Sequence, residues 1–70
     1  MDLIKKFFVN GQEYETYGDF TLPQLLYYFN YRERFFVIEY NNLICDKKDW
    51  PKIRIKSNDK IEIVTIVGGG

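Results

Sequence analysis

The sequence predicts a small α+β domain, and three observations lead to this: a two-residue hairpin turn near the start, one amphipathic helix, and an alternating strand near the end. The chain has 70 residues, which allows one domain with one modest core. Hydrophobic residues make up 46% of it, which is enough for a globular core and too much for a disordered chain. With strands at both ends, we expect the helix to pack on one face of a single sheet.

The hairpin is centred on Asn10-Gly11, the strongest two-residue turn signal, because both residues tolerate positive φ angles. The apolar run Phe7-Phe8-Val9 precedes this turn, and polar and aromatic residues alternate after it. We therefore expect strands near residues 3–9 and 12–17.

The helix signal begins at Thr21, whose hydroxyl can accept a backbone N–H bond at the helix N-terminus. Gln24 follows three residues later, as a capping box requires, and Pro23 lies in the first turn, where its missing N–H costs nothing. Four apolar residues recur at i, i+3, i+4 and i+7 and share one face, namely Leu22, Leu25, Leu26 and Phe29. The helix is expected to end near residues 30–32.

The middle of the chain predicts two short strands and a polar loop. Residues 35–40 are rich in aromatic and branched residues, Asn41-Asn42 is a turn signal, and residues 43–44 form a short returning strand. Residues 46–51 form the loop, with at most one helical turn, which Pro51 is expected to stop. Trp50 is expected to fold back on the core.

The last part of the chain predicts a short extended piece, a turn and the final strand. Residues 53–56 alternate between isoleucine and basic residues, and Asn58-Asp59 forms the last turn. Ile61 and Ile63 then alternate with polar residues and are expected in the core. The apolar strand continues to Val67, before the three closing glycines.

Charge and composition exclude several function classes. Lysine plus arginine equals aspartate plus glutamate, whereas a nucleic-acid binder is expected to have a basic excess. The chain has no histidine and only one cysteine, so we expect no catalytic residue and no metal site of its own. Nothing resembles a signal peptide or a membrane span, so a reducing compartment is expected.

The closing glycines, residues 68–70, directly follow the final strand. Glycine has no side chain, so a terminal carboxylate carried on glycines can thread into a narrow active site, where a bulky residue would block entry. A frayed terminus is the alternative explanation. The position of the glycines at the end of a strand in a small α+β domain favours a functional tail.

Several segments together resemble one protein family, the thiamin-biosynthesis sulfur carriers (ThiS). The resemblance covers nearly the whole chain, and its most specific parts are the turn after the middle strand, the charged segment that ends in Trp50, and the closing glycines. The segments are Asn10-Gly11, 21–26, 36–42, 44–50 and 59–70. The sequence departs from the family's common pattern in its aromatic content, at Tyr27, Tyr28, Tyr31, Phe35 and Phe36.

This resemblance implies a ubiquitin-like β-grasp fold, with a mixed sheet of four to five strands packed on one main helix. Residues 1–67 would form the β-grasp domain and residues 68–70 a flexible tail. The family motif maps onto Gly69 and Gly70, and Gly70 is the residue that would be modified.

The resemblance also implies a reaction cycle in which the chain is a protein co-substrate and not an enzyme. An adenylating enzyme of the ThiF type would use ATP to activate the carboxylate of Gly70, and the chain itself would bind no cofactor. Sulfur from a donor of the cysteine desulfurase type would give a thiocarboxylate. A thiazole synthase of the ThiG type would then take the sulfur.

Three other groups of residues each have a functional and a structural interpretation. Val64 and Ile66 share one face of the last strand, and they are either a docking patch for the activating enzyme or buried core. Cys45 is either a persulfide carrier or a small apolar residue, and the latter is favoured because no nearby group obviously lowers its pKa. The basic group of Lys47, Lys48 and Lys52 either contacts an acidic partner or lies in a solvated loop.

Three alternative functions remain open. The small subunit of molybdopterin synthase shares the fold and the Gly-Gly end, although the chain length and the segment ending in Trp50 favour thiamin. A ubiquitin-like protein modifier and a plain β-grasp interaction domain are the other two. The many Phe, Tyr, Ile, Asn and Lys residues indicate AT-rich codons, so either a bacterial cytoplasm or a plastid stroma is expected.

Overall fold

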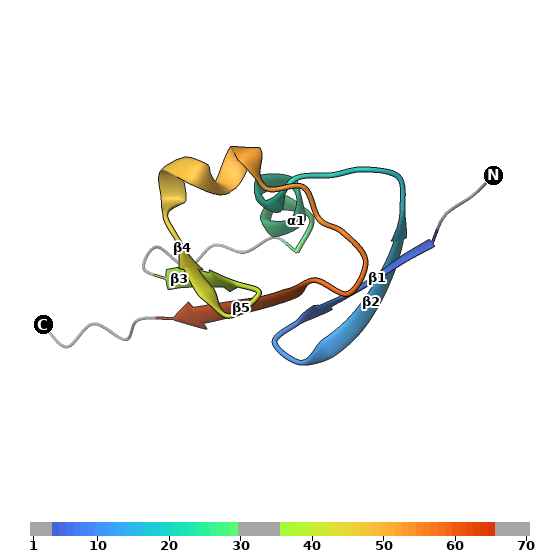
Figure 1. Ribbon diagram of the computed structural model, residues 1–70, viewed down its shortest axis with the longest axis horizontal. Helices are drawn as coiled ribbons and strands as arrows, with labels where there is room; N and C mark the ends of the chain where they lie inside the picture. Colours follow the sequence, from blue (N-terminus) through green and yellow to red (C-terminus); the bar gives the residue numbers. More distant parts are fainter. Residues whose placement is uncertain (1–3, 30–35, 66–70) are drawn as a thin grey trace, which may run out of the picture.

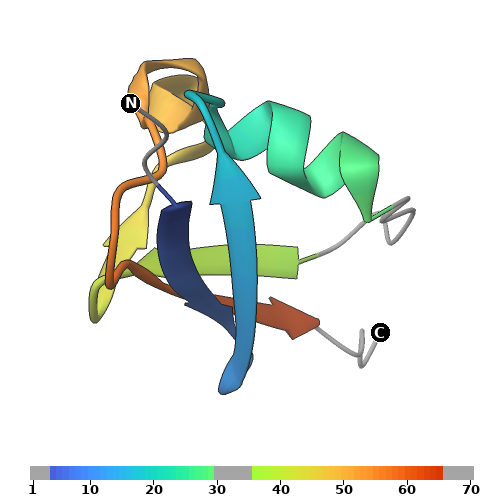
Figure 2. The same ribbon diagram turned by 90° about the vertical axis from the view of Figure 1, so that its right-hand side faces the viewer.

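A five-stranded mixed sheet and one α-helix form the body of the protein, as the computed structural model shows for residues 4–29 and 36–65 (Figure 1). The helix lies on one face of the sheet (Figure 2). The elements are β1 (Ile4–Val9), β2 (Gln12–Tyr17), α1 (Leu22–Tyr28), β3 (Phe36–Tyr40), β4 (Leu43–Cys45), the 3-10 helix η1 (Lys47–Lys52) and β5 (Lys60–Thr65). The expected α+β class is confirmed.

The strand order is β2-β1-β5-β3-β4, so the last strand of the chain lies in the middle of the sheet. β1 and β5 run parallel, and every other neighbouring pair is antiparallel. We call the face that α1 covers the inner face and the opposite one the outer face.

Asparagine residues lie in the turns of both antiparallel hairpins of the sheet. Asn10 and Gly11 have φ angles of 50° and 81°, and Asn41 and Asn42 have 51° and 74°. Positive φ at both central residues is the geometry whose twist matches that of the flanking strands. The predicted strands of the first hairpin are therefore confirmed to within one residue.

Asn10 also connects the hairpin to the last strand. Its side-chain Oδ1 accepts a hydrogen bond from the N–H of Ile63 at 2.7 Å, and its own N–H donates to the carbonyl of Ile61 at 2.9 Å. One turn residue thus fixes the position of β5 against β1.

The helix begins as predicted. The N–H of Gln24 donates to Thr21 Oγ1 at 3.4 Å, and Gln24 Oε1 accepts from the N–H of Thr21 at 2.8 Å, which completes the capping box. The helix ends at Tyr28 with Phe29 as its C-cap, so the expected end near residues 30–32 is wrong. The last turn has no basic residue to stabilise its carbonyl groups, and its aromatic residues are weak helix formers.

The core lies between α1 and the inner face of the sheet. The predicted helix face is confirmed, since Leu22, Leu25 and Leu26 are buried and Phe29 packs at the margin. Ile61 and Ile63 are buried, as predicted. The other buried hydrophobic residues among those described are Phe7, Val9, Ile38, Trp50 and Ile55.

The segment after β4 folds differently from its prediction. Pro51 does not stop the helical turn but lies inside η1, which ends at Lys52. The two hydrogen bonds that close this helix run from Asp49 N to Asp46 O and from Ile53 N to Trp50 O, so neither needs the N–H that proline lacks. Trp50 folds back on the core as predicted, and its Nε1 donates to the carbonyl of Cys45 at 3.2 Å.

A short extended piece follows η1 and brings the start of the helix against it. Thr21 forms an isolated β-bridge with Arg54, and the N–H of Leu22 donates to the carbonyl of Ile53 at 2.9 Å. The predicted alternation is confirmed by Ile55, which is fully buried.

Asp59, which directly precedes β5, is buried, with 5% of its surface exposed. Its carboxylate accepts hydrogen bonds from the Tyr40 hydroxyl at 2.6 Å, the N–H of Lys56 at 2.7 Å and Asn41 Nδ2 at 3.1 Å. Burial and the neighbouring Asp59 carboxylate raise the pKa of Tyr40 to about 12. These three hydrogen bonds offset the free-energy cost of burying the Asp59 carboxylate.

We predict that Tyr40→Phe lowers the free energy of unfolding at pH 8 by about 1.5–3 kcal/mol, the usual value of a hydrogen bond to a charged group. Because the folded state raises the phenol pKa, it holds this proton more tightly than the unfolded state does. The contribution is complete below pH ~10, the ordinary tyrosine pKa, and is lost as the pH rises through about 12.

Urea unfolding of wild type and variant across this pH range measures the effect. Tyr17→Phe is the control, since Tyr17 is 68% exposed, and it should change stability by less than ~0.5 kcal/mol. Equal losses in the two variants, or a wild-type advantage that persists above the raised pKa, would contradict the prediction.

Candidate functional site

The glycines that are predicted to be modified follow β5 in the sequence. Gly68, Gly69, Gly70 and Ile66 lie outside the described residues, which end at Thr65. β5 leads toward them as the central strand, with β1 parallel on one side and β3 antiparallel on the other. β1 therefore holds only the start of β5, at Lys60 and Ile61, whereas β3 pairs with β5 from Ile61 to Thr65.

Val64 lies on the outer face, where it is 44% exposed. Ile61 and Ile63 point to the opposite, inner face, as the alternation of a strand requires. Of the two interpretations for Val64, the structure therefore excludes burial in the core. Its cross-strand neighbour is Val37, so the two valines lie side by side on the outer face.

The outer face near Val64 combines apolar side chains with carboxylates. Glu62 lies opposite Glu39, which in turn pairs with Ile44 of β4. Ile44 is 74% exposed. An apolar patch with a pair of acidic groups beside it suits a partner surface that is apolar with basic residues around it.

Cys45 has the properties of a packing residue. It is half-buried, and its Sγ lies 3.6 Å from the carbonyl oxygen of Asp46. Burial raises the pKa of the Cys45 thiol, and the nearby Asp49 and Asp46 raise it further. A thiol that holds its proton is a weak nucleophile, which supports the structural interpretation.

The basic group after β4 makes local contacts. Lys47 Nζ lies 5.9 Å from the centre of the Trp50 ring, and Lys52 Nζ lies 3.7 Å from Asp49 Oδ1. Both interactions are near the surface, where they contribute little. A contact with an acidic partner stays a prediction.

Two classes of site are absent from the part of the chain that the structure describes. No group of three or more His, Cys, Asp or Glu side chains is placed there to hold a metal ion. No helix within 4–29 and 36–65 is long and apolar enough to cross a membrane.

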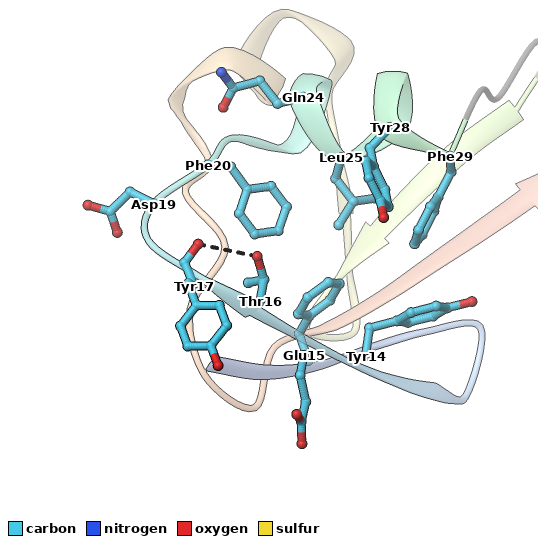
Figure 3. A pocket seen from close by; sticks show the side chains of 11 residues that line it. Tyr14, Glu15, Thr16, Tyr17, Asp19, Phe20, Gln24, Leu25, Tyr28 and Phe29 are labelled. Carbon is cyan, nitrogen blue, oxygen red and sulfur yellow. Dashed lines mark hydrogen bonds between the residues drawn. The ribbon is translucent and has the colours of Figure 1, made fainter. Parts of the chain in front are cut away.

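A cleft of about 470 Å³ between β2 and α1 was not anticipated from the sequence (Figure 3). Six of its eleven lining residues are aromatic, and none is lysine or arginine. Residues 10–29 contain no basic residue at all, and this is the signal that sequence analysis could have used.

Comparison with known proteins gives a consistent result for the family and the fold. A model of the ThiS family matches residues 7–70. A ycf40 protein from Trieres chinensis is 61% identical over 66 residues, which cover 94% of this chain and 90% of the relative. A ycf40 protein from Porphyra purpurea is 32% identical over 62 residues, which cover 89% and 87%.

The fold is matched by a crystal structure of the thiamine biosynthesis protein (ThiS) from Geobacter metallireducens. The TM-score is 0.81, and the match covers 93% of this chain and 99% of that one. The sequence identity is 20%, so this likeness concerns the fold alone. The expected β-grasp architecture is confirmed.

We predict that iodoacetamide at pH 8 alkylates Cys45 more slowly in the folded protein than in urea, because the folded state raises the thiol pKa and so lowers the thiolate fraction. Intact-mass measurement over time gives both rates, and a glutathione sample with and without urea corrects for the solvent. A folded rate equal to or above the unfolded rate would show that Cys45 is an activated thiol.

Proposed function

The chain belongs to the ThiS family, and from this we propose that it is a sulfur carrier protein whose Gly70 carboxylate becomes a thiocarboxylate for thiazole formation in thiamin biosynthesis. The observation that supports this most is the extent of the family match. It runs from residue 7 to residue 70, so it includes the three closing glycines as well as the β-grasp body.

The proposed chemistry activates a poor electrophile. A carboxylate oxygen of Gly70 attacks the α-phosphate of ATP on a ThiF-type enzyme, and pyrophosphate leaves. The outer sulfur of a persulfide, carried by a donor of the cysteine desulfurase type, then attacks the acyl carbon, and AMP leaves with the C–O bond electrons. A thiol reductant attacks the donor's sulfur in the resulting acyl disulfide, so that a disulfide forms between the thiol and the donor and the Gly70 thiocarboxylate leaves. The product is a thiocarboxylate, from which a ThiG-type thiazole synthase takes the sulfur.

The residues of the chain suit the role of a co-substrate. It contains no histidine, and its one cysteine is half-buried with a raised thiol pKa, so the catalytic groups are supplied by the partners. Glycine at residues 68–70 leaves the acyl carbon unshielded, as a narrow active site requires. In this proposal the chain holds no cofactor, and ATP is bound by the activating enzyme.

We assign docking of the activating enzyme to the outer face around Val64. This patch lies on the strand that leads to the tail, and it is apolar with carboxylates beside it. Burying an exposed valine and its apolar neighbours contributes roughly 25 cal/mol per Å² of apolar area. Ile66, two residues after Val64 in the sequence, is proposed as part of the same patch.

The thiamin pathway and a plastid stroma are the proposed setting. The match to the ThiS family over residues 7–70 supports the thiamin pathway, and the relatives named ycf40 support the plastid.

We predict that incubation with ATP, a matching ThiF-type enzyme and a sulfur source adds the mass of one sulfur in place of one oxygen, located at Gly70. Deletion of Gly70 should abolish this gain without changing the thermal melt. Intact-mass spectrometry with fragment mapping measures the mass gain and its position.

A ladder of higher-mass conjugates would indicate a protein modifier, and no change with an active enzyme would indicate a plain binding domain. Sulfur release to molybdopterin synthase but not to thiazole synthase would reassign the pathway.

We predict that Val64→Asp weakens use by the activating enzyme roughly tenfold, or ~1.4 kcal/mol, because it places a charge in the apolar contact. ATP–pyrophosphate exchange against carrier concentration measures this as a rise in KM. Leu43→Asp is the matched control, since Leu43 is also exposed, at 74%, but lies on the edge strand β4. Equal effects of the two variants, with unchanged melts, would remove the outer face from the docking site.

A further inference from the structure

We propose that the cleft between β2 and α1 binds an extended segment of a partner protein that carries lysine or arginine, and that this segment adds as a strand to the edge of β2. The inference concerns a surface on the helix side of the sheet and is independent of the tail chemistry. It rests on the cleft, the strand edge and the charge of this region.

The cleft has a continuous aromatic floor (Figure 3). The Phe7 ring lies 5.9 Å from that of Tyr14 and 5.7 Å from that of Phe20, and Tyr14 lies 5.0 Å from Phe29. Tyr28 borders the cleft from α1 and is 82% exposed. Such rings offer a large apolar contact area for the apolar side chains of a partner.

The edge of β2 runs beside this cleft. β2 is a terminal strand of the described sheet and is six residues long, without proline. Its main-chain groups on the side away from β1 have no neighbouring strand within residues 4–29 and 36–65. An extended peptide pairs with such an edge through backbone hydrogen bonds, and the alternate side chains of the peptide determine the specificity of binding.

The side chains of β2 predict what the added strand should look like. Tyr14 and Thr16 are half-buried on the inner face, beside the cleft, whereas Glu13, Glu15 and Tyr17 are exposed on the outer face. Apolar residues of the partner therefore face the cleft, and its intervening lysine or arginine residues face the glutamates across the strand pair.

The charge of the region supports a basic partner. All ten lysine and arginine residues of the chain lie outside residues 10–29, which contain Glu13, Glu15 and Asp19. Asp19 pairs with Lys5 at 2.6 Å, and Glu13 lies 3.8 Å from Lys6. Glu15 lies opposite Lys6 in the strand register, but Lys6 Nζ pairs with Glu13 and Glu15 forms no ion pair among the described residues, so its carboxylate can accept one from a partner.

A second copy of this chain is a poor occupant of the same edge. Antiparallel pairing of two β2 strands would bring Glu13 and Glu15 of one copy close to those of the other, and like charges on facing strands are unfavourable. A small cationic ligand could contact the rings but would leave the strand edge unpaired.

The test uses a fluorescent ten-residue peptide that alternates valine and arginine, with the full-length protein. We expect binding by anisotropy that weakens with salt, and amide NMR shifts confined to β2, α1 and their connection. Matched peptides carry glutamate for arginine, or proline at alternate positions, which removes backbone donors. Both should fail to bind.

Two exposed positions separate the proposal from non-specific attraction. Tyr28→Ala and Glu15→Lys should each weaken binding roughly three- to fivefold, as expected for loss of one apolar ring contact in the cleft and of one charge contact on the outer face. Tyr27→Ala is the control, because Tyr27 is 88% exposed on the same helix but does not line the cleft. The proposal is wrong if the basic peptide fails to bind, if the glutamate peptide binds equally, if Tyr27→Ala weakens binding as much as Tyr28→Ala, or if sedimentation shows a dimer through β2.

Discussion

The buried carboxylate of Asp59 fixes the position of β5, on which the rest of the sheet depends. It accepts bonds from Tyr40 at the end of β3, from Asn41 in the next turn and from the backbone of Lys56. The carbonyl of Asp59 accepts from the N–H of Phe8 in β1. A slip of β5 by one residue would break these bonds and turn the polar side of β5 toward the helix, so the register and the core are specified together.

Local signals predicted most of the elements, because they act within a few residues. The capping box at Thr21 and the turn at Asn10-Gly11 are examples, and both formed as expected. The error at Pro51 is also local, because the hydrogen bonds on either side of it join residues three apart and do not need its N–H. The role of Asp59 was missed for a different reason, since its side chain binds partners up to 19 residues away, which no local pattern reveals.

The candidate site was predictable in a different way. The glycine tail can be recognised in the sequence as three consecutive glycines, and the family match extends over it, although residues 66–70 are not among those described. The exposure of Val64 needed the structure, since alternation alone left both faces of β5 apolar. The aromatic cleft needed it as well, because Phe7, Tyr14 and Phe29 come from three separate elements.

The parallel pairing of β1 with β5 has a consequence for how the protein is made. Translation yields β1 first and β5 last, yet Phe8 and Val9 pair with Lys60 and Ile61 in the centre of the sheet. A nascent chain can form the first hairpin early, but its core stays open until the ribosome has added β5. Prematurely terminated chains that lack β5 therefore remain unfolded and open to proteolysis, and the folded pool is enriched in molecules whose synthesis has reached the segment that leads to the tail.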